Sequence, residues 1–149
     1  MATTPAFATT PKRGVASWLS TTTANTKSDG TGTIGTDILL AFTAGSSGSW
    51  IDRIRINPVG STAATATTAT VARVYTSTVT SGATTNANTN LWQEKACPAQ
   101  TTDQTTTATV PVDFDAGFRL EANATILFSM HHAAAANTSW DITVIASDY

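Results

Sequence analysis

Apolar and polar residues alternate along residues 49–60, which read SWIDRIRINPVG. Within this stretch, Ile54 and Ile56 alternate with Arg53 and Arg55. Successive side chains of a β-strand point to opposite faces, so this period indicates a half-buried strand. We expect the isoleucines to face a core and the arginines to face away from it. The register should be firmly held, because a slip of one residue would bury both guanidinium groups.

Further segments have the length and residue types of strands, and turn residues separate them. They are residues 13–20, 33–43, 68–77, 91–97, 104–112, 124–132 and 139–147. No segment has a convincing helical period. Short strands of this number in 149 residues predict an all-β protein, an antiparallel β-sandwich of the jelly-roll type with about eight strands. A seven-stranded immunoglobulin-like sandwich is the alternative fold, although its disulfide and tryptophan signature is missing.

Three of these strands have a clearly apolar face, which we expect to pack in the core. The apolar positions are Ile34, Ile38, Leu40 and Phe42; then Ile126, Phe128 and Met130; then Trp140, Ile142, Val144 and Ala146. In the last strand, Asp141, Thr143 and Ser147 take the opposite face.

The chain predicts a single domain over residues 12–149, preceded by an extended arm over residues 1–11. Pro5 and Pro11 disfavour helix and limit ladder pairing in the arm, so we expect it to lie outside the sandwich. Residues 78–90 are polar and low in complexity, which predicts a mobile loop.

Charge is sparse and unevenly distributed. Charged residues make up 12% of the chain, and the net charge is −2. Residues 1–75 hold six basic and three acidic side chains, whereas residues 76–149 hold two basic and seven acidic ones. The whole chain has no general attraction for nucleic acid or an anionic membrane, so we expect neither as a partner. The two halves are electrostatically complementary, within one subunit or between subunits.

Cysteine content and the N-terminal sequence bear on the compartment. Cys97 is the single cysteine, so no intrachain disulfide can form, and the chain fits folding in a reducing cytosol. The segment MATTPAFATTPKRG lacks the apolar centre of a secretory signal. The longest apolar run, ILLAF at residues 38–42, is far too short to span a membrane.

Two small groups of residues are candidates for chemistry. His131 and His132 would point to opposite faces of a strand, so they could share a metal ion only with further ligands such as Cys97. Asp113 and Asp115 put two carboxylates on one strand face, as glycoside hydrolysis or Ca²⁺ binding requires, although turn chemistry is the commoner role. We expect no metal, no cofactor and no catalytic residue.

Aromatic and basic side chains offer candidates for binding. Trp18, Trp50, Trp92 and Trp140 could stack on sugars, but each lies within or at the start of a strand, so core packing is expected for most. Arg53, Arg55 and Arg73 occupy alternating positions on two consecutive strands. They form either a solvated sheet face or a stripe that faces a partner, for which the planar arginine fork is well suited.

Several motifs run across most of the chain, outside residues 78–90. They are the start MATTPAFATTPKRGVASWLSTTTANTKSDGTGT, then GSSGSWIDRIRINPVG, VARVYTS, LWQEKACP and the ending DITVIASDY. In these motifs the chain resembles small β-proteins of tailed bacteriophages and prophages, in particular head decoration, or cement, proteins.

The resemblance implies a jelly-roll homotrimer that is made in the host bacterial cytoplasm, binds the major capsid protein on the outer surface of the virion head and has no active site. The candidate subunit or capsid interface consists of Phe7, Lys12, Arg13, Arg53, Arg55 and Arg73. A head-fibre or receptor- or glycan-binding virion module is the alternative function. A glycan hydrolase that uses Asp113 and Asp115 is a third and weaker one.

Overall fold

The computed structural model describes residues 7–61, 65–102 and 108–149, and these residues form strands and turns without a helix. None of them belongs to a helix that could cross a membrane. The strands are β1 (Thr10–Leu19), β2 (Gly32–Thr33), β3 (Leu39–Thr43), β4 (Ser49–Gly60), β5 (Thr65–Ala66), β6 (Thr70–Ser77), β7 (Ala83–Thr84), β8 (Thr89–Cys97), β9 (Thr101–Thr102), β10 (Val112–Phe114), β11 (Phe118–Leu120), β12 (Thr125–Met130) and β13 (Thr138–Asp148).

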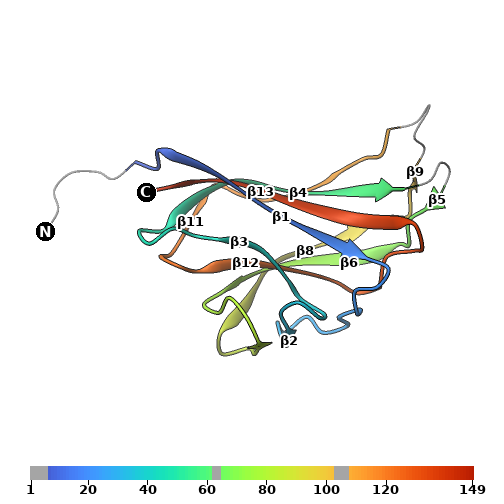
Figure 1. Cartoon of the computed structure of the whole chain (residues 1–149), viewed down its shortest axis with the longest axis horizontal. Coiled ribbons are helices and arrows are strands. Elements are labelled where there is room, and N and C mark those ends of the chain that lie inside the picture. The colour runs from blue at the N-terminus through green and yellow to red at the C-terminus, as the bar shows by residue number, and fades with distance from the viewer. Residues whose placement is uncertain (1–6, 62–64, 103–107) are drawn as a thin grey trace, which may run out of the picture.

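Two antiparallel sheets dominate the described part of the chain and lie as two layers (Figure 1). The five-stranded sheet has the order β1-β13-β4-β10, and β11 also pairs with β4. The four-stranded sheet has the order β3-β12-β6-β8. Two further pairs, β2 with β7 and β5 with β9, form small sheets of their own. The prediction of an all-β protein with antiparallel sheets is confirmed.

A large apolar core fills the space between the two sheets. Ile54 and Ile56 are fully buried in it, whereas Arg53 is exposed and Arg55 is half-buried, which confirms the predicted register of β4. The apolar faces predicted for the last two long strands are confirmed as well, since all seven of their side chains belong to the core: Ile126, Phe128, Met130, Trp140, Ile142, Val144 and Ala146.

The prediction of one strand over residues 33–43 is wrong. A turn with Gly35 at a φ of 88° divides the segment into β2 and β3, and the carboxylate of Asp37 fixes this turn by accepting a backbone hydrogen bond at 2.6 Å. Phe42 faces the main core, whereas Ile38 packs in a second cluster on the other side of the four-stranded sheet. These side chains therefore do not share a face.

The prediction of a strand over residues 104–112 also needs correction. Residues 104–107 lie outside the described part of the chain, and residues 108–111 are not in a strand. The pairing starts at β10 and continues in β11, with a turn at Gly117 (φ 84°) between them. Both short strands pair with β4, whose twelve residues offer enough length for two successive partners.

Residues 78–90, whose composition predicts a mobile loop, contain a short strand and several hydrogen bonds. β7 lies within this segment and pairs with β2. The Asn88 side chain accepts a hydrogen bond from the backbone N–H of Thr85 at 2.8 Å, and the Asn88 carbonyl accepts one from Thr78 at 3.0 Å. Turn and ladder bonds thus fix a stretch that has few apolar side chains.

The predicted N-terminal arm overlaps the first strand. Residues 1–6 lie outside the described part of the chain, and Phe7 is the first described residue. β1 begins at Thr10, so Thr10 and Pro11 pair with β13 instead of belonging to a separate arm. Pro11 is compatible with this position because β1 is an edge strand.

Candidate interaction surface

The outer face of the four-stranded sheet is partly covered by the chain itself. Residues 20–38 connect β1 to β3 and lie against this sheet, below it in Figure 1. Tyr75 and Leu127, which point out from the sheet, form a small buried cluster with Ile38. The backbone N–H of Asn25 also donates to the last carbonyl of β12 at 3.0 Å. Residues 20–38 therefore cover the outer face over β12 and β6, whereas Leu91, Glu94 and Ala96 of β8 remain exposed.

Arg73 is buried in this covered face. Its side chain is 8% exposed, and its Nε donates to the Glu94 carboxylate at 3.1 Å. Its Nη1 donates to the backbone oxygen of Asn25 at 3.0 Å. The prediction that Arg73 belongs to a partner-facing surface is wrong, because residues 20–38 cover it and its guanidinium donates to Glu94 and Asn25 of the same chain.

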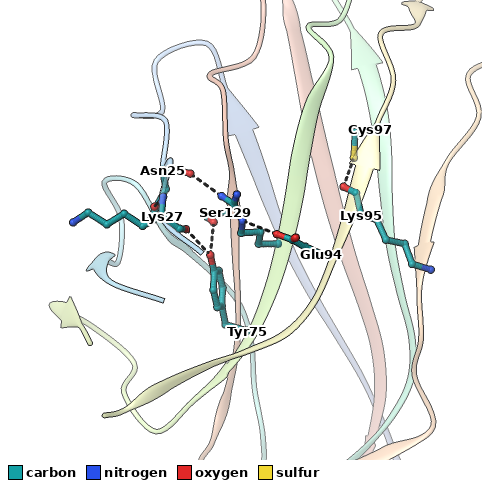
Figure 2. A network of polar contacts seen from close by, with 8 residues as sticks. Asn25, Lys27, Tyr75, Glu94, Lys95, Cys97 and Ser129 are labelled. Carbon is teal, nitrogen blue, oxygen red and sulfur yellow. Dashed lines mark hydrogen bonds and ion pairs between the residues drawn. The ribbon is translucent and has the colours of Figure 1, made fainter. Parts of the chain in front are cut away.

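The polar contacts around Arg73 continue to Tyr75. The Tyr75 hydroxyl lies 3.1 Å from Ser129 Oγ and donates to the backbone oxygen of Lys27 at 3.3 Å (Figure 2). Burial raises the pKa of Tyr75, so the phenol stays protonated at neutral pH. Together these bonds fasten the covering segment to the sheet, which gives the network a structural role.

The outer face of the five-stranded sheet carries exposed basic and apolar side chains instead. β-Sheet register places Arg13, Ile145 and Arg53 in one row across β1, β13 and β4. Ile145 is 37% exposed, which leaves an apolar side chain between two cations. We call this surface the arginine face and define it by Arg13, Val15, Trp50, Arg53, Arg55, Asp113 and Ile145.

Charge on the arginine face is only partly compensated. Arg55 and Asp113 form a two-pronged ion pair, with Nε to Oδ1 at 2.6 Å and Nη2 to Oδ2 at 2.8 Å. This pair lowers the pKa of Asp113 and raises that of Arg55. Arg13 and Arg53 are exposed and make no ion pair with any described residue. The face thus presents two guanidinium groups that are free to meet carboxylates outside the chain.

A β-bulge brings Arg53 onto this face. The pairing of β13 with β4 shifts between Ile145 and Ala146, and Asp52 is the extra residue on β4. Asp52 and Arg53 are consequently exposed in succession, although strict alternation would bury one of them. Bulges of this kind re-aim side chains, and here the result is an outward-facing arginine.

The remaining predicted interface residues are Lys12 and Phe7, and Lys12 takes the opposite side of β1 from Arg13, because it pairs with the core residue Ala146. Lys12 contacts the Asp148 carboxylate at 3.4 Å, and Asp148 also accepts hydrogen bonds from Ser49 and Gly45. These contacts, the Ser49 bond above all, lower the pKa of Asp148. Phe7 precedes β1 and is 75% exposed. Lys12 is therefore engaged in a contact within the chain, whereas Phe7 is open to solvent.

The two acidic candidates have separate local partners. Asp113 is held by Arg55, as described above. The Asp115 carboxylate accepts a hydrogen bond from Gln93, and Lys95 Nζ lies 3.9 Å from it. Both carboxylates are thus occupied at the surface by groups of the opposite charge or by donors. The hydrogen bond from Arg55 lowers the pKa of Asp113, which is the opposite of what a general acid requires.

The histidine pair and Cys97 are not brought together with further ligands. The rings of His131 and His132 contact each other edge-on, with centroids 4.7 Å apart. Among the described residues, no group of three or more His, Cys, Asp and Glu could hold a metal ion. Burial raises the pKa of Cys97 to about 11, so its thiol is protonated at neutral pH and is a poor nucleophile.

The tryptophans divide evenly between core and surface. Trp18 and Trp140 are fully buried, whereas Trp50 and Trp92 are partly exposed, so the expectation of core packing for most of the four holds for only two. Trp50 joins the arginine face, and the Trp92 ring lies on Phe118 with centroids 4.2 Å apart. The sequence reasoning missed Ile145. Alternation with Val144 and Ala146 could have placed it outward on its own strand, but its position beside the arginines depends on the pairing of β13 with β1 and β4.

Comparisons with known proteins give one weak structural similarity. The sequence matches no protein-family model and no curated protein. The chain is similar to a chain of the solved structure described as "Cyanophage Pam1 capsid asymmetric unit". The TM-score is 0.40 and the sequence identity is 17%, over 100% of this chain and 92% of that chain.

Proposed function

We propose that this protein is a structural protein of a phage virion and binds the outside of the head shell as a decoration, or cement, protein. The arginine face carries this proposal. It combines the free cations Arg13 and Arg53 with the exposed apolar side chains Val15, Trp50 and Ile145. Aromatic and arginine side chains are enriched in protein interfaces, and the motif resemblance of the sequence points to the same class.

We also assign the fold to the jelly-roll class. The support comes from the pairing of strands that lie far apart in the chain. β1 pairs with β13, β3 with β12, β4 with β10 and β11, and β6 with β8. We count β10 and β11 as one interrupted strand, which leaves eight main strands. The first of these pairs with the eighth, the second with the seventh, the third with the sixth and the fourth with the fifth. This is the pattern of a long hairpin rolled into two sheets, which the jelly roll represents.

The proposed partners are the major capsid protein and two further copies of this chain in a homotrimer. Arginine is suited to carboxylates of a neighbouring subunit because its planar fork donates two parallel hydrogen bonds. A ring of three copies would also protect sheet edges such as β1, which pairs with β13 on one side only. The trimer would be refuted if light scattering gave a monomer mass at high concentration and single copies of the chain lay isolated on the head.

The test is binding of the purified chain to phage heads assembled without it, followed by electron microscopy of the decorated heads. Arg53→Ala should weaken binding about tenfold at low salt, a loss of about 1.4 kcal/mol and ordinary for an interface arginine. Lys27→Ala is the matched control, because it also removes one exposed positive charge but lies on the covering segment of the other sheet. Equal affinities of the two variants, or density for the chain away from the shell, would refute the proposal.

A further inference from the structure

A groove of about 300 Å³ opens between the two sheets, away from the residues that define the arginine face. It lies where the end of β6 and the start of β8 meet β11 of the other sheet. Its volume is at the lower end of the range of about 300–1,000 Å³ that small-molecule sites occupy. The proposed binding to a head shell makes no use of it.

The apolar part of the groove is built around two aromatic rings. Trp92 is 44% exposed, and Phe118 supports its ring at a centroid distance of 4.2 Å. The indole Nε1 donates to the backbone oxygen of Asp115 at 3.2 Å, which fixes the orientation of the ring. Leu120 and Ala124 extend the apolar lining. The groove therefore contains a held aromatic platform that is open to solvent on one side.

The polar part of the groove includes Arg119, whose guanidinium lies over the Tyr149 ring, and three side chains that have no hydrogen-bond or ion-pair partner among the described residues. Thr76 and Asn90 lie directly opposite each other in the pairing of β6 with β8, and Glu121 lines the groove after β11. None of these three side chains makes a hydrogen bond or ion pair with another described residue. A hydroxyl, an amide and a carboxylate are thus all free to bind a ligand beside the aromatic platform.

We infer that this groove binds a neutral pyranose sugar of a glycan. A pyranose has an apolar C–H face that packs on an aromatic ring and a rim of hydroxyl groups that both donate and accept hydrogen bonds. Trp92 supplies the platform, Asn90 and Thr76 donate and accept, and Glu121 accepts from hydroxyl groups. One cationic and one anionic residue line the groove, Arg119 and Glu121, so its formal charge is balanced and favours a neutral ligand.

The test uses saturation-transfer NMR to detect binding of methyl glycosides of glucose, galactose and N-acetylglucosamine to the full chain. An array of neutral and acidic glycans supports it. We expect transfer to at least one neutral glycoside. Asn90→Ala and Glu121→Ala should each weaken that binding about tenfold, because each removes a hydrogen-bonding group without touching the core. Asn86→Ala is the matched control, since Asn86 is an exposed asparagine on the same connection outside the groove lining.

Three outcomes would overturn the inference. The first is that no neutral glycoside shows saturation transfer, and the second is that the chain selectively binds acidic glycans or a peptide. The third is that both groove variants still bind the neutral sugar. The substituted side chains are exposed, so both variants should melt at the temperature of the unmodified chain. Arg53→Ala should leave sugar binding unchanged, which separates failure of this inference from failure of the proposed shell binding.

Discussion

The outer faces of the two sheets use arginine in opposite ways. On the four-stranded sheet, Arg73 is buried beneath residues 20–38 and bonded to Glu94 and Asn25. On the five-stranded sheet, Arg53 is exposed and has no ion pair with a described residue. Both arginines lie on a long strand beside a core-facing residue. Alternation along a strand therefore determines which side of the sheet a side chain takes. A segment distant in the sequence determines whether that side is covered.

Both sheets pack their inner sides in one shared core, and Ile56→Ala tests this packing. Ile56 is fully buried between the sheets. Truncation should lower the free energy of unfolding by ~2–5 kcal/mol, the usual cost of removing a buried isoleucine side chain. Urea unfolding followed by tryptophan fluorescence measures the change. A loss below about 1 kcal/mol would contradict the register of β4 and with it the assignment of the arginine face.

Arg73→Ala should have the next largest effect, because it acts on the covered face. The substitution leaves the Asn25 carbonyl without its donor and removes an ion pair with Glu94. We expect a loss of about 2–3 kcal/mol, reduced from the cost of a fully buried pair because Glu94 is half exposed. Faster hydrogen exchange should accompany it in residues 20–38. Unchanged exchange there would show that Arg73 does not fasten the covering segment.

Most of the fold follows from alternation in the sequence, and the exceptions have a local cause. Residues 124–132 and 139–147 could be assigned correctly because each buries a regular apolar face. Residues 33–43 could not, because a single turn at Gly35 divides an apolar run that looks continuous. The strand at Asp113 was missed for a related reason. Two carboxylates around a phenylalanine suggest a turn, and only pairing with β4 makes the first of them part of a strand.

The candidate surfaces were less accessible to sequence reasoning than the core. Arg53 and Arg55 could be placed outward from their own strand. That Arg13 shares their face depends on β1 pairing with β13 and β13 with β4, which brings together residues from both ends of the chain. The groove at Trp92 has the same origin, since its second ring comes from β11. Predicting a surface that is built from distant strands requires knowing which strands are neighbours in the sheet. Hydrophobic periodicity along the sequence does not give this order.

The loss of stability in acid should be a smaller effect, and it depends on Asp148, which lies outside the arginine face. Hydrogen bonding to Ser49, aided by Lys12, lowers the pKa of Asp148 in the folded state. Its stabilising contribution is therefore present above the unfolded pKa of about 3.9 and is lost as the pH falls through the folded pKa. Asp148→Asn should flatten the acid limb of stability against pH, measured by urea unfolding between pH 2 and pH 6. An unchanged slope would mean that these bonds contribute nothing to the folded state.

Arg55→Ala should have the smallest effect on stability, and it completes the comparison because the same substitution is made at Arg73. The Arg55–Asp113 pair has good geometry, but its side chains are 35% and 52% exposed. Water solvates both groups after the pair is broken, so the expected loss is well below that of Arg73→Ala and shrinks further at high salt. A double-mutant cycle with Asp113→Ala, measured at low and high salt, isolates the coupling between the two side chains. A loss equal to that of Arg73→Ala would show that exposure does not distinguish the two faces. A small loss would leave Arg55 free to exchange Asp113 for a carboxylate of a partner, which is what the arginine face requires.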